Sequence, residues 1–294
     1  MLSKPVNYNN YNILFDKGSS ISFEHNNIKY NLYSQNQNCG LKFSEMIEFT
    51  VDEILDNAFF EKLETNLKKK KIKNFYFRLH PLSTISEKKK IEKFLTEKNY
   101  IFNFQKTLIL RLNNSIIDLK KNLRKSYKSL INREIKKIKF LNINTNENKF
   151  FFFDTWLKIY SKAISRGSKK IPNTAKEALL KSFNKYEIEI FLAYEKDDIE
   201  FRNVLGGMLF SKKNDYAYYS LSANSNLIEK SNFRAIGHSI MWYAIEYLKN
   251  NGVKFIDFGT ILTTESDKIN NINKFKLGFG GDLIETIFFE KKFK

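Results

Sequence analysis

The sequence predicts a mixed α/β fold, in which helices pack on a mixed sheet, organised as two lobes. Segments rich in aromatic and β-branched residues alternate along the chain with segments whose apolar residues recur at helical spacing, and this alternation is typical of helices packed on a sheet. The 294 residues, 42% of them hydrophobic, are enough for two modest domains. We place the lobes at residues 1–140 and 141–294, and the absence of a Gly- or Ser-rich linker predicts that they dock directly.

The first half is expected to follow the order helix, strand, helix, strand. Apolar residues at helical spacing predict a helix over 59–71, and the aromatic run 74–79 predicts a strand that ends before Pro81. A capping pattern at Ser86 begins the next helix, and 100–112 has the composition of a long strand.

The most charged stretch, residues 115–139, is predicted to form one amphipathic helix. Its apolar residues fall on a single helical stripe, and Lys and Arg fill the remaining positions. Two interpretations stay open: an ordinary solvated basic face, and a surface that binds phosphates. The polar residues 142–149 are expected to form the seam between the lobes.

The second half is predicted as two helices, three strands, a helix, and two further strands separated by a loop with a short helix. Helices are expected at 151–166, 174–184 and 235–250, and strands at 187–194, 204–210, 217–222, 254–258 and 282–289. Asn214-Asp215 predicts a hairpin turn, and Asn251-Gly252 predicts the end of a helix.

The composition excludes several function classes. Cys39 is the only cysteine, so no disulfide within the chain is possible, and the three histidines lie far apart in the sequence, so we expect no metal. The sequence contains no uninterrupted run of 18 apolar residues, so we expect no membrane span. Residues 1–11 lack the apolar core of a signal peptide. We therefore expect a cytoplasmic protein, with the inner face of the membrane as an alternative location.

The formal charge of +18, from 50 basic and 32 acidic residues, has two explanations. It fits an anionic partner such as tRNA, a nucleotide-linked sugar or the pyrophosphate of CoA. It equally fits a Lys- and Asn-rich composition that has no bearing on function. Charge alone therefore does not choose between them.

A glycine-containing loop precedes the helix predicted at 235–250. It contains Arg234 and Gly237, followed by His238 and Ser239. Small residues let backbone N–H groups approach a pyrophosphate, and the N-terminus of a helix is electropositive. These four residues are our candidates for binding a cofactor. The loop resembles the Arg/Gln-x-x-Gly-x-Gly/Ala loop of GNAT acyltransferases, with Ser239 in place of the last small residue.

Several other segments, in the correct order from about residue 70 to the end, resemble FemABX-type transferases. They are the Asp-Phe-Gly strand end at 257–259, the Phe-Lys-x-Gly-Phe-Gly-Gly segment at 275–281, the strand at 217–223, the basic helix at 125–137 and the strand with Pro at 77–81. Lys128 and Glu134 depart from the residues that the family usually has in the basic helix. The first 70 residues match nothing in the family.

The resemblance implies a GNAT-like acyltransferase fold of two GNAT-like lobes, in which a central hairpin separates from the next parallel strand and holds the acyl donor. It implies transfer of an acyl or aminoacyl group, from acyl-CoA or aminoacyl-tRNA, to an amine of a cell-envelope precursor. That precursor is a peptidoglycan peptide or an amino sugar, linked to a nucleotide or a lipid. The loop at 234–239 favours CoA and the basic excess allows tRNA, so the donor stays open.

Three residues are our candidates for catalysis. Lys276 is placed to contact the acyl carbonyl or a carrier phosphate, because a cation stabilises a developing oxyanion. Asp257 ends a buried strand, where a carboxylate can act as a base or orient the amine, although a turn-forming role is equally compatible. Tyr219 alternates with Tyr218 across a strand, so one of the two faces the donor.

Three further residues are candidates for binding substrate. Arg166 ends a helix beside a glycine, where it binds a phosphate or simply complements the helix C-terminus. Phe275 precedes Lys276, and Lys128 lies on the basic helix. Two other function classes are kept as alternatives: a non-enzymatic nucleic-acid-binding protein, and a catalytically silent scaffold with the same fold.

Overall fold

The computed structural model describes residues 19–25, 28–35, 38–41, 56–165, 173–184, 188–200, 203–225 and 235–293. The chain divides into two compact units. Unit 1 consists of Met1–Lys106, Pro172–Ala178 and Ile284–Lys294, and unit 2 of Thr107–Ile171 and Leu179–Leu283. The boundary expected at residues 140 and 141 lies inside unit 2, so the compact units do not follow it, and a repeat of two lobes stays a prediction.

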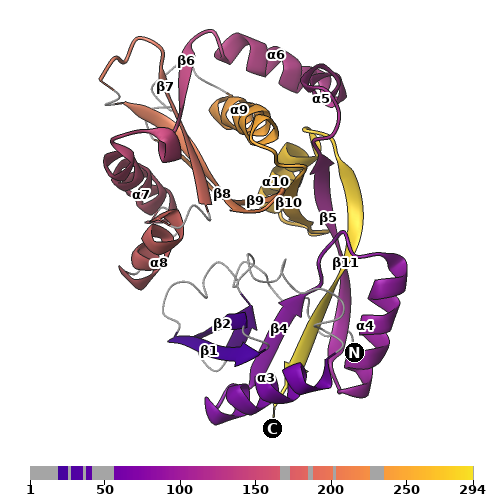
Figure 1. The fold of residues 1–294 in the computed structure, drawn as a ribbon. Helices are drawn as coiled ribbons and strands as arrows, with labels where there is room; N and C mark the ends of the chain where they lie inside the picture. The colour runs from indigo at the N-terminus through magenta and orange to yellow at the C-terminus, as the bar shows by residue number, and fades with distance from the viewer. Residues whose placement is uncertain are drawn as a thin grey trace. The chain divides into compact units, whose positions relative to one another are not determined.

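Unit 1 contains a sheet with two helices (Figure 1). Its strands lie in the order β1 (Ser19–His25), β2 (Ile28–Gln35), β3 (Asn38–Leu41), β4 (Asn74–Arg78) and β11 (Asp282–Lys292). Its helices are α3 (Asn57–Lys69) and α4 (Ile85–Glu97). The stripe predicted for the first helix is confirmed, since Phe59, Phe60, Leu63 and Leu67 are buried. In α4, Thr84 and Glu87 form a capping box.

Unit 2 contains the second half of the fold, in which the strand order is β5-β10-β9-β8-β7-β6. The strands are β5 (Ile101–Arg111), β6 (Ile138–Asn142), β7 (Ile188–Glu195), β8 (Val204–Lys213), β9 (Tyr216–Asn224) and β10 (Phe255–Ile261). The helices are α5 (Ile116–Asn122), α6 (Lys125–Glu134), the 3-10 turn η2 (Ile143–Thr145), α7 (Lys149–Ser165), α9 (Ile236–Asn250) and α10 (Asp267–Leu277). Strands β5 and β11 and helix α8 (Asn173–Asn184) are divided between the units.

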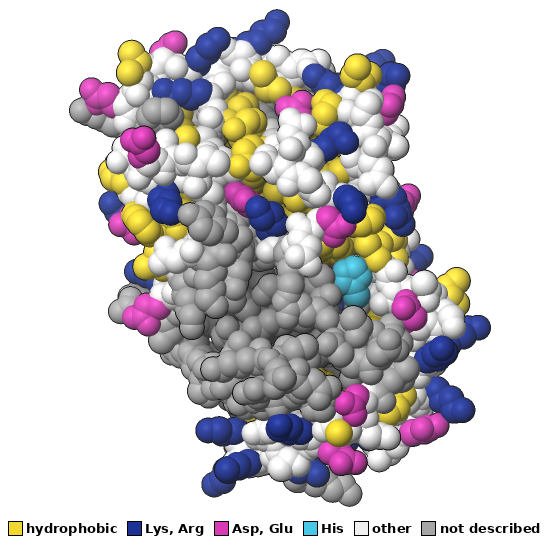
Figure 2. All heavy atoms as spheres, viewed as in Figure 1, with side chains coloured by type: hydrophobic (Ala, Val, Ile, Leu, Met, Phe, Trp, Pro, Cys, Tyr) yellow, Lys and Arg dark blue, Asp and Glu magenta, His cyan; other side chains and the backbone are white. Residues whose placement is uncertain are grey.

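On the face seen in Figure 2, the described Lys and Arg side chains are scattered among Asp and Glu rather than gathered into one field. None of the helices in the described part of the chain combines the length and the apolar character that a membrane span requires.

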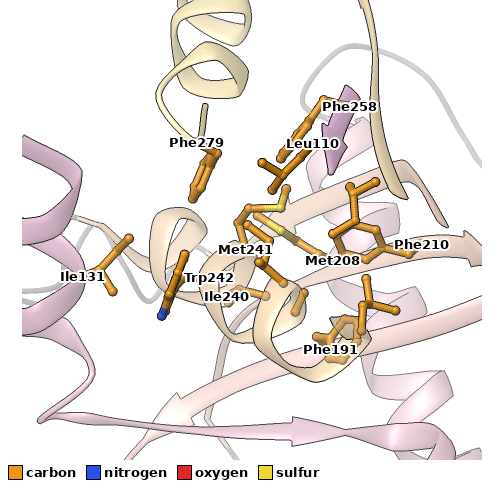
Figure 3. Close-up of a cluster of buried hydrophobic side chains, with 14 of the residues drawn as sticks. Leu110, Ile131, Phe191, Met208, Phe210, Ile240, Met241, Trp242, Phe258 and Phe279 are labelled. Carbon is orange, nitrogen blue, oxygen red and sulfur yellow. The ribbon is translucent and has the colours of Figure 1, made fainter. Parts of the chain in front are cut away.

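Helix α9 packs on one face of the sheet of unit 2. Its residues Ile240, Met241 and Trp242 lie against Met208 and other buried side chains of β7 and β8, and Ile131 of α6 points toward Trp242 (Figure 3). Burial of so many large apolar side chains gives this face the main share of the hydrophobic stabilisation of the unit. The start of α9 is therefore held rigidly relative to β8 and β9.

Helix α7 packs on the opposite face. Strand β7 alternates between the two cores, since Phe191 and Ala193 join the α9 core, whereas Ile190 and Leu192 join the α7 core. A Cβ atom on Gly207 would lie 2.7 Å from the ring of Trp156, so only glycine lets α7 approach β8 this closely.

The helix predicted over 115–139 is wrong as a single element. The chain breaks after Asn122, and Arg124 N–H donates to the carbonyl of Gly278 at 2.9 Å instead of continuing the helix. The last residues of the predicted helix and the start of the predicted seam form β6, which pairs antiparallel with β7. A tertiary contact and strand pairing thus override the helical periodicity, which is a weak local preference. The strands β1, β2 and β3 were not predicted.

The remaining described elements agree with the predicted ones to within a few residues, and the mixed α/β fold class is confirmed. The expected hairpin turn is present between β8 and β9, where Asn214 has a φ of 50°. Gly252, with a φ of 83°, follows the end of α9 as expected.

Candidate functional site

The parallel pairing of β9 and β10 stops early. The two strands pair from Phe255–Tyr216 to Asp257–Tyr218, and no pairing follows although β9 continues to Asn224 and β10 to Ile261. Backbone N–H and C=O groups along the inner edges of the two strands are therefore left without a ladder partner among the described strands. Such groups are strong donors and acceptors for a ligand placed between the strands.

A β-bulge lies in β9 directly beyond the last paired residue. The register against β8 steps from Leu209–Leu221 to Phe210–Tyr219, so that Ser220 is one extra residue in β9. Ser220 Oγ lies 2.8 Å from Ser211 Oγ of β8, which ties the bulge to the neighbouring strand. A bulge bends a strand and re-aims its side chains, and here it does so where β9 leaves β10.

Asp257 is fully buried at this point of separation. Its carboxylate accepts hydrogen bonds from Thr107 Oγ1 at 2.6 Å and from the Tyr216 hydroxyl at 2.8 Å. The N–H of Gly259 donates to the same carboxylate at 2.6 Å. These bonds fit the turn-forming interpretation of Asp257, while the predicted role of a base stays untested.

Helix α10 brings Phe275 and Lys276 to the separated end of β10. Lys276 Nζ donates to the carbonyl oxygen of Thr260 at 3.1 Å. Thr260 lies three residues beyond Asp257, the last residue of β10 that pairs with β9. Phe275 packs against Tyr219 of β9, with ring centroids 6.5 Å apart. The two candidates on α10 are thus half-buried beside the strands that separate.

The first turn of α9 carries Gly237, His238 and Ser239. No side chain caps this helix among the described residues, so its first backbone N–H groups depend on other acceptors. Ser239 is buried and its hydroxyl donates back to the carbonyl of Ala235 at 3.3 Å. Serine therefore fills this position with its hydroxyl satisfied inside the helix, which explains how it replaces a smaller residue.

His238 lies among aromatic rings of α6, of α10 and of the turn that follows α10. The ring of Tyr127, from α6, meets it edge-on at 4.3 Å, and those of Phe275 and Phe279 lie at 5.1 Å and 6.2 Å. Burial lowers the pKa of His238 below its usual value, because the charged imidazolium loses solvation. The neutral imidazole is therefore the favoured form at neutral pH.

Tyr219 and Tyr218 lie in different surroundings. Tyr219 packs in the aromatic group of Phe210, Phe258 and Phe275. Burial raises the pKa of Tyr219, so the phenol stays protonated and can act as a donor. The phenol oxygen of Tyr218 lies against Gly259, 3.0 Å from where a Cβ atom would be.

The remaining candidates are not brought to this place by the described structure. Lys128 Nζ donates to the carbonyl of Lys121 at 2.6 Å, which closes the end of α5. Arg166 and Arg234 lie outside the described residues. Within the residues that the structure does describe, no three His, Cys, Asp or Glu side chains form a group that could hold a metal ion.

Sequence reasoning missed three residues that build this region: Thr107, Tyr216 and Tyr127. Tyr127 sits on the apolar stripe of its helix and gives no signal of its own. Thr107 is a buried polar residue at the start of an apolar run of β5, and that polarity was the available signal. Tyr216 stands at the start of β9, and its contact with Asp257 could not be predicted because it joins residues 41 positions apart.

Comparisons with known proteins give a shared fold. No protein-family model and no curated protein sequence matches the chain. The structure of L-PGS from Bacillus licheniformis is similar with a TM-score of 0.64 and 12% identity, over 96% of this chain and 86% of that one. The crystal structure of FemX is similar with a TM-score of 0.62 and 11% identity, over 94% and 88% of the two chains.

A third similar structure is a C-terminal domain assigned to a lysylphosphatidylglycerol synthetase from Agrobacterium fabrum, with a TM-score of 0.59 and 8% identity, over 95% of this chain and 85% of that one. Identities this low show the fold alone. The chain shares its mixed α/β fold with FemX and with L-PGS from Bacillus licheniformis.

Proposed function

We propose that the protein is an N-acyltransferase that moves an acyl or aminoacyl group from an activated carrier to an amine of a cell-envelope precursor. One observation carries the proposal: β9 and β10 separate after Asp257, and the ammonium of Lys276 is held at the carbonyl of Thr260 just beyond. A cation at the place where two strands separate is suited to a reaction that develops negative charge on a carbonyl oxygen. The fold shared with FemX supports a transferase.

The chemistry asks little of the protein beyond position and charge. The amine nitrogen forms a bond to the acyl carbon, the carbonyl oxygen becomes an oxyanion, and the bond from that carbon to the carrier sulfur or oxygen then breaks. The proton lost by the amine goes to the leaving carrier or to water. In this scheme Lys276 stabilises the oxyanion, Tyr219 donates a hydrogen bond, and binding supplies the rest of the rate gain by orientation.

The donor is acyl-CoA or aminoacyl-tRNA. The start of α9 at Gly237 and His238, which no side chain of the described residues caps, supports a phosphate-bearing carrier, because backbone N–H groups and the helix dipole there favour anions. The similarity to a lysylphosphatidylglycerol synthetase, whose name describes an aminoacyl group on a lipid, supports the aminoacyl form. Thermal shifts with CoA, acetyl-CoA and bulk tRNA at fixed ionic strength distinguish the two, since a ligand that binds the folded state raises Tm.

The reaction is tested by mass spectrometry with acetyl-CoA or aminoacyl-tRNA as donor. The acceptors are amino sugars, a peptidoglycan peptide and phosphatidylglycerol vesicles. The proposal predicts a new amide on an amine acceptor, formed only with the donor that raises Tm. An ester on phosphatidylglycerol instead would make the acceptor a hydroxyl. Absence of any product with both donors would leave the catalytically silent scaffold.

A further inference from the structure

Asp257 joins three strands at the point where β9 and β10 separate. Oδ1 accepts from Thr107 of β5 at 2.6 Å, and Oδ2 accepts from the Tyr216 hydroxyl of β9 at 2.8 Å. The carboxylate is fully buried, with 0% of the residue exposed. A buried carboxylate with several donors is held in one position, because losing any donor would leave charge unsatisfied.

The same carboxylate fixes the backbone of its own strand. Gly259 N–H donates to Oδ1 at 2.6 Å, so this N–H points to a side chain of β10 rather than along the ladder to β9. Gly259 has a φ of 81°, a left-handed conformation that favours glycine. Strand β10 therefore changes direction at Gly259, two residues after its last pair with β9 at Asp257.

The turn leads directly to the candidate catalytic lysine. Thr260 follows Gly259, and its carbonyl accepts the hydrogen bond from Lys276 Nζ at 3.1 Å. Because Thr260 directly follows Gly259, the left-handed φ of Gly259 sets the direction in which the chain enters Thr260, whose carbonyl accepts from Lys276. A chain of contacts thus runs from the Asp257 carboxylate through Gly259 and Thr260 to the ammonium.

We propose that Asp257 is a positioning residue, which holds the backbone at Gly259 and so sets the place of the Lys276 ammonium at the Thr260 carbonyl. The importance of Asp257 for catalysis rests on the proposed acyl transfer. Its role in holding the backbone at Gly259 does not depend on that proposal. The carboxylate itself does not touch the substrate, since it is enclosed by protein.

The experiment compares full-length Asp257→Ala, Asp257→Asn and Thr107→Val with Phe258→Leu, a matched control from the same buried strand. Amide hydrogen exchange at Gly259 and Thr260 is measured by NMR, at temperatures chosen to give each variant equal global stability. Asp257→Ala removes every acceptor oxygen and is expected to speed exchange at Gly259 at least tenfold over Phe258→Leu. Asp257→Asn keeps one acceptor oxygen and is expected to restore most of the protection.

Acyl transfer is measured on the same variants with the donor that raises Tm. Asp257→Ala is expected to lower kcat with little change in KM for the carrier, and Asp257→Asn to recover most of kcat. Equal exchange at Gly259 in Asp257→Ala and Phe258→Leu, or no recovery in Asp257→Asn, would overturn the positioning role. If Asp257→Ala does not fold, Thr107→Val is used for the test instead. This variant is expected to speed amide exchange at Gly259 by a smaller factor, and an unchanged exchange rate at Gly259 would contradict the positioning role. Faster exchange at Gly259 in Asp257→Ala, together with no acyl transfer by the wild type, would contradict the proposed function and still support the positioning role.

Discussion

Side chains around His238 show how burial sets chemistry at the level of single residues. The imidazole lies among Tyr127, Phe275 and Phe279, which offer ring surfaces. Its lowered pKa follows from this burial. A neutral imidazole at the first turn of α9 leaves the backbone N–H groups there as the positive end of the helix.

The shifted pKa of His238 predicts a pH dependence of stability. As pH falls through about 6.5, the unfolded chain binds a proton that the folded protein does not, so stability present above 6.5 is lost down to the folded pKa. Tm of the wild type is therefore expected to fall more between pH 7.5 and pH 5.5 than Tm of His238→Gln. Parallel Tm curves for the two proteins would contradict this account.

Glu246 is the control for that measurement, because its shift has the opposite sign. Burial raises the pKa of Glu246, so its contribution is present below its ordinary value of 4.5 and is lost as pH rises through the folded value. Glu246→Gln is expected to change the curve at the acid end of the range and to leave the His238 effect in place.

Replacing glycine by alanine is expected to have opposite effects on stability at Gly278 and at Gly237. A Cβ atom at Gly278 would lie 2.1 Å from the Tyr127 ring, so Gly278→Ala is expected to destabilise the protein by about 1–3 kcal/mol. At Gly237 the nearest atoms would lie 3.7 Å away, so Gly237→Ala fits and is expected to keep or raise stability. Denaturant unfolding measures both.

The affinity of Gly237→Ala for the carrier tests whether Gly237 serves donor binding rather than stability. If the glycine serves the approach of a phosphate to the backbone, Gly237→Ala weakens carrier binding in a protein of unchanged stability. Equal carrier affinity in Gly237→Ala and the wild type would remove this loop from the donor site.

At the scale of elements, contacts between residues distant in the sequence set features of the fold that the local sequence pattern did not predict. The helices α3 and α9 were predicted from the sequence, α3 from apolar residues at helical spacing and α9 from the Asn251-Gly252 signal at its end. The break between α5 and α6 was not predictable, since it depends on Arg124 meeting the carbonyl of Gly278. The Asp257 contacts were equally hidden, because they join β5, β9 and β10.

Helix α6 is tied to α10 at the end of α10 that carries Lys276. The Tyr127 hydroxyl donates to the carbonyl of Lys274 at 3.0 Å. Tyr127→Phe keeps the ring contacts with His238 and removes only this bond, so we expect a loss of about 1 kcal/mol in the free energy of unfolding. Tyr243→Phe, whose ring stacks on Phe140 at 4.8 Å, is the matched control and should change stability less. Equal losses in the two variants would contradict the link.

At the scale of the whole molecule, the net charge bears on the partner, and the fold bears on the class of function. The net charge of +18 is compatible with a tRNA partner, but the charges on the visible face are mixed in sign (Figure 2). The fold is shared with FemX and L-PGS, and the local geometry of unit 2 provides the candidate site. Fold alone does not fix a reaction, so the function depends on that site.

The most direct test of the central claim is the rate of acyl transfer by Lys276→Ala compared with Lys274→Ala. Both lysines lie in the last turn of α10, and Lys274 is exposed whereas Lys276 reaches Thr260. Lys276→Ala is expected to lower kcat by about 10²–10³-fold, the usual effect of removing an oxyanion donor, and Lys274→Ala is expected to stay near the wild-type rate. Equal rates in the two folded variants would contradict the claim that Lys276 acts at the separation of β9 and β10.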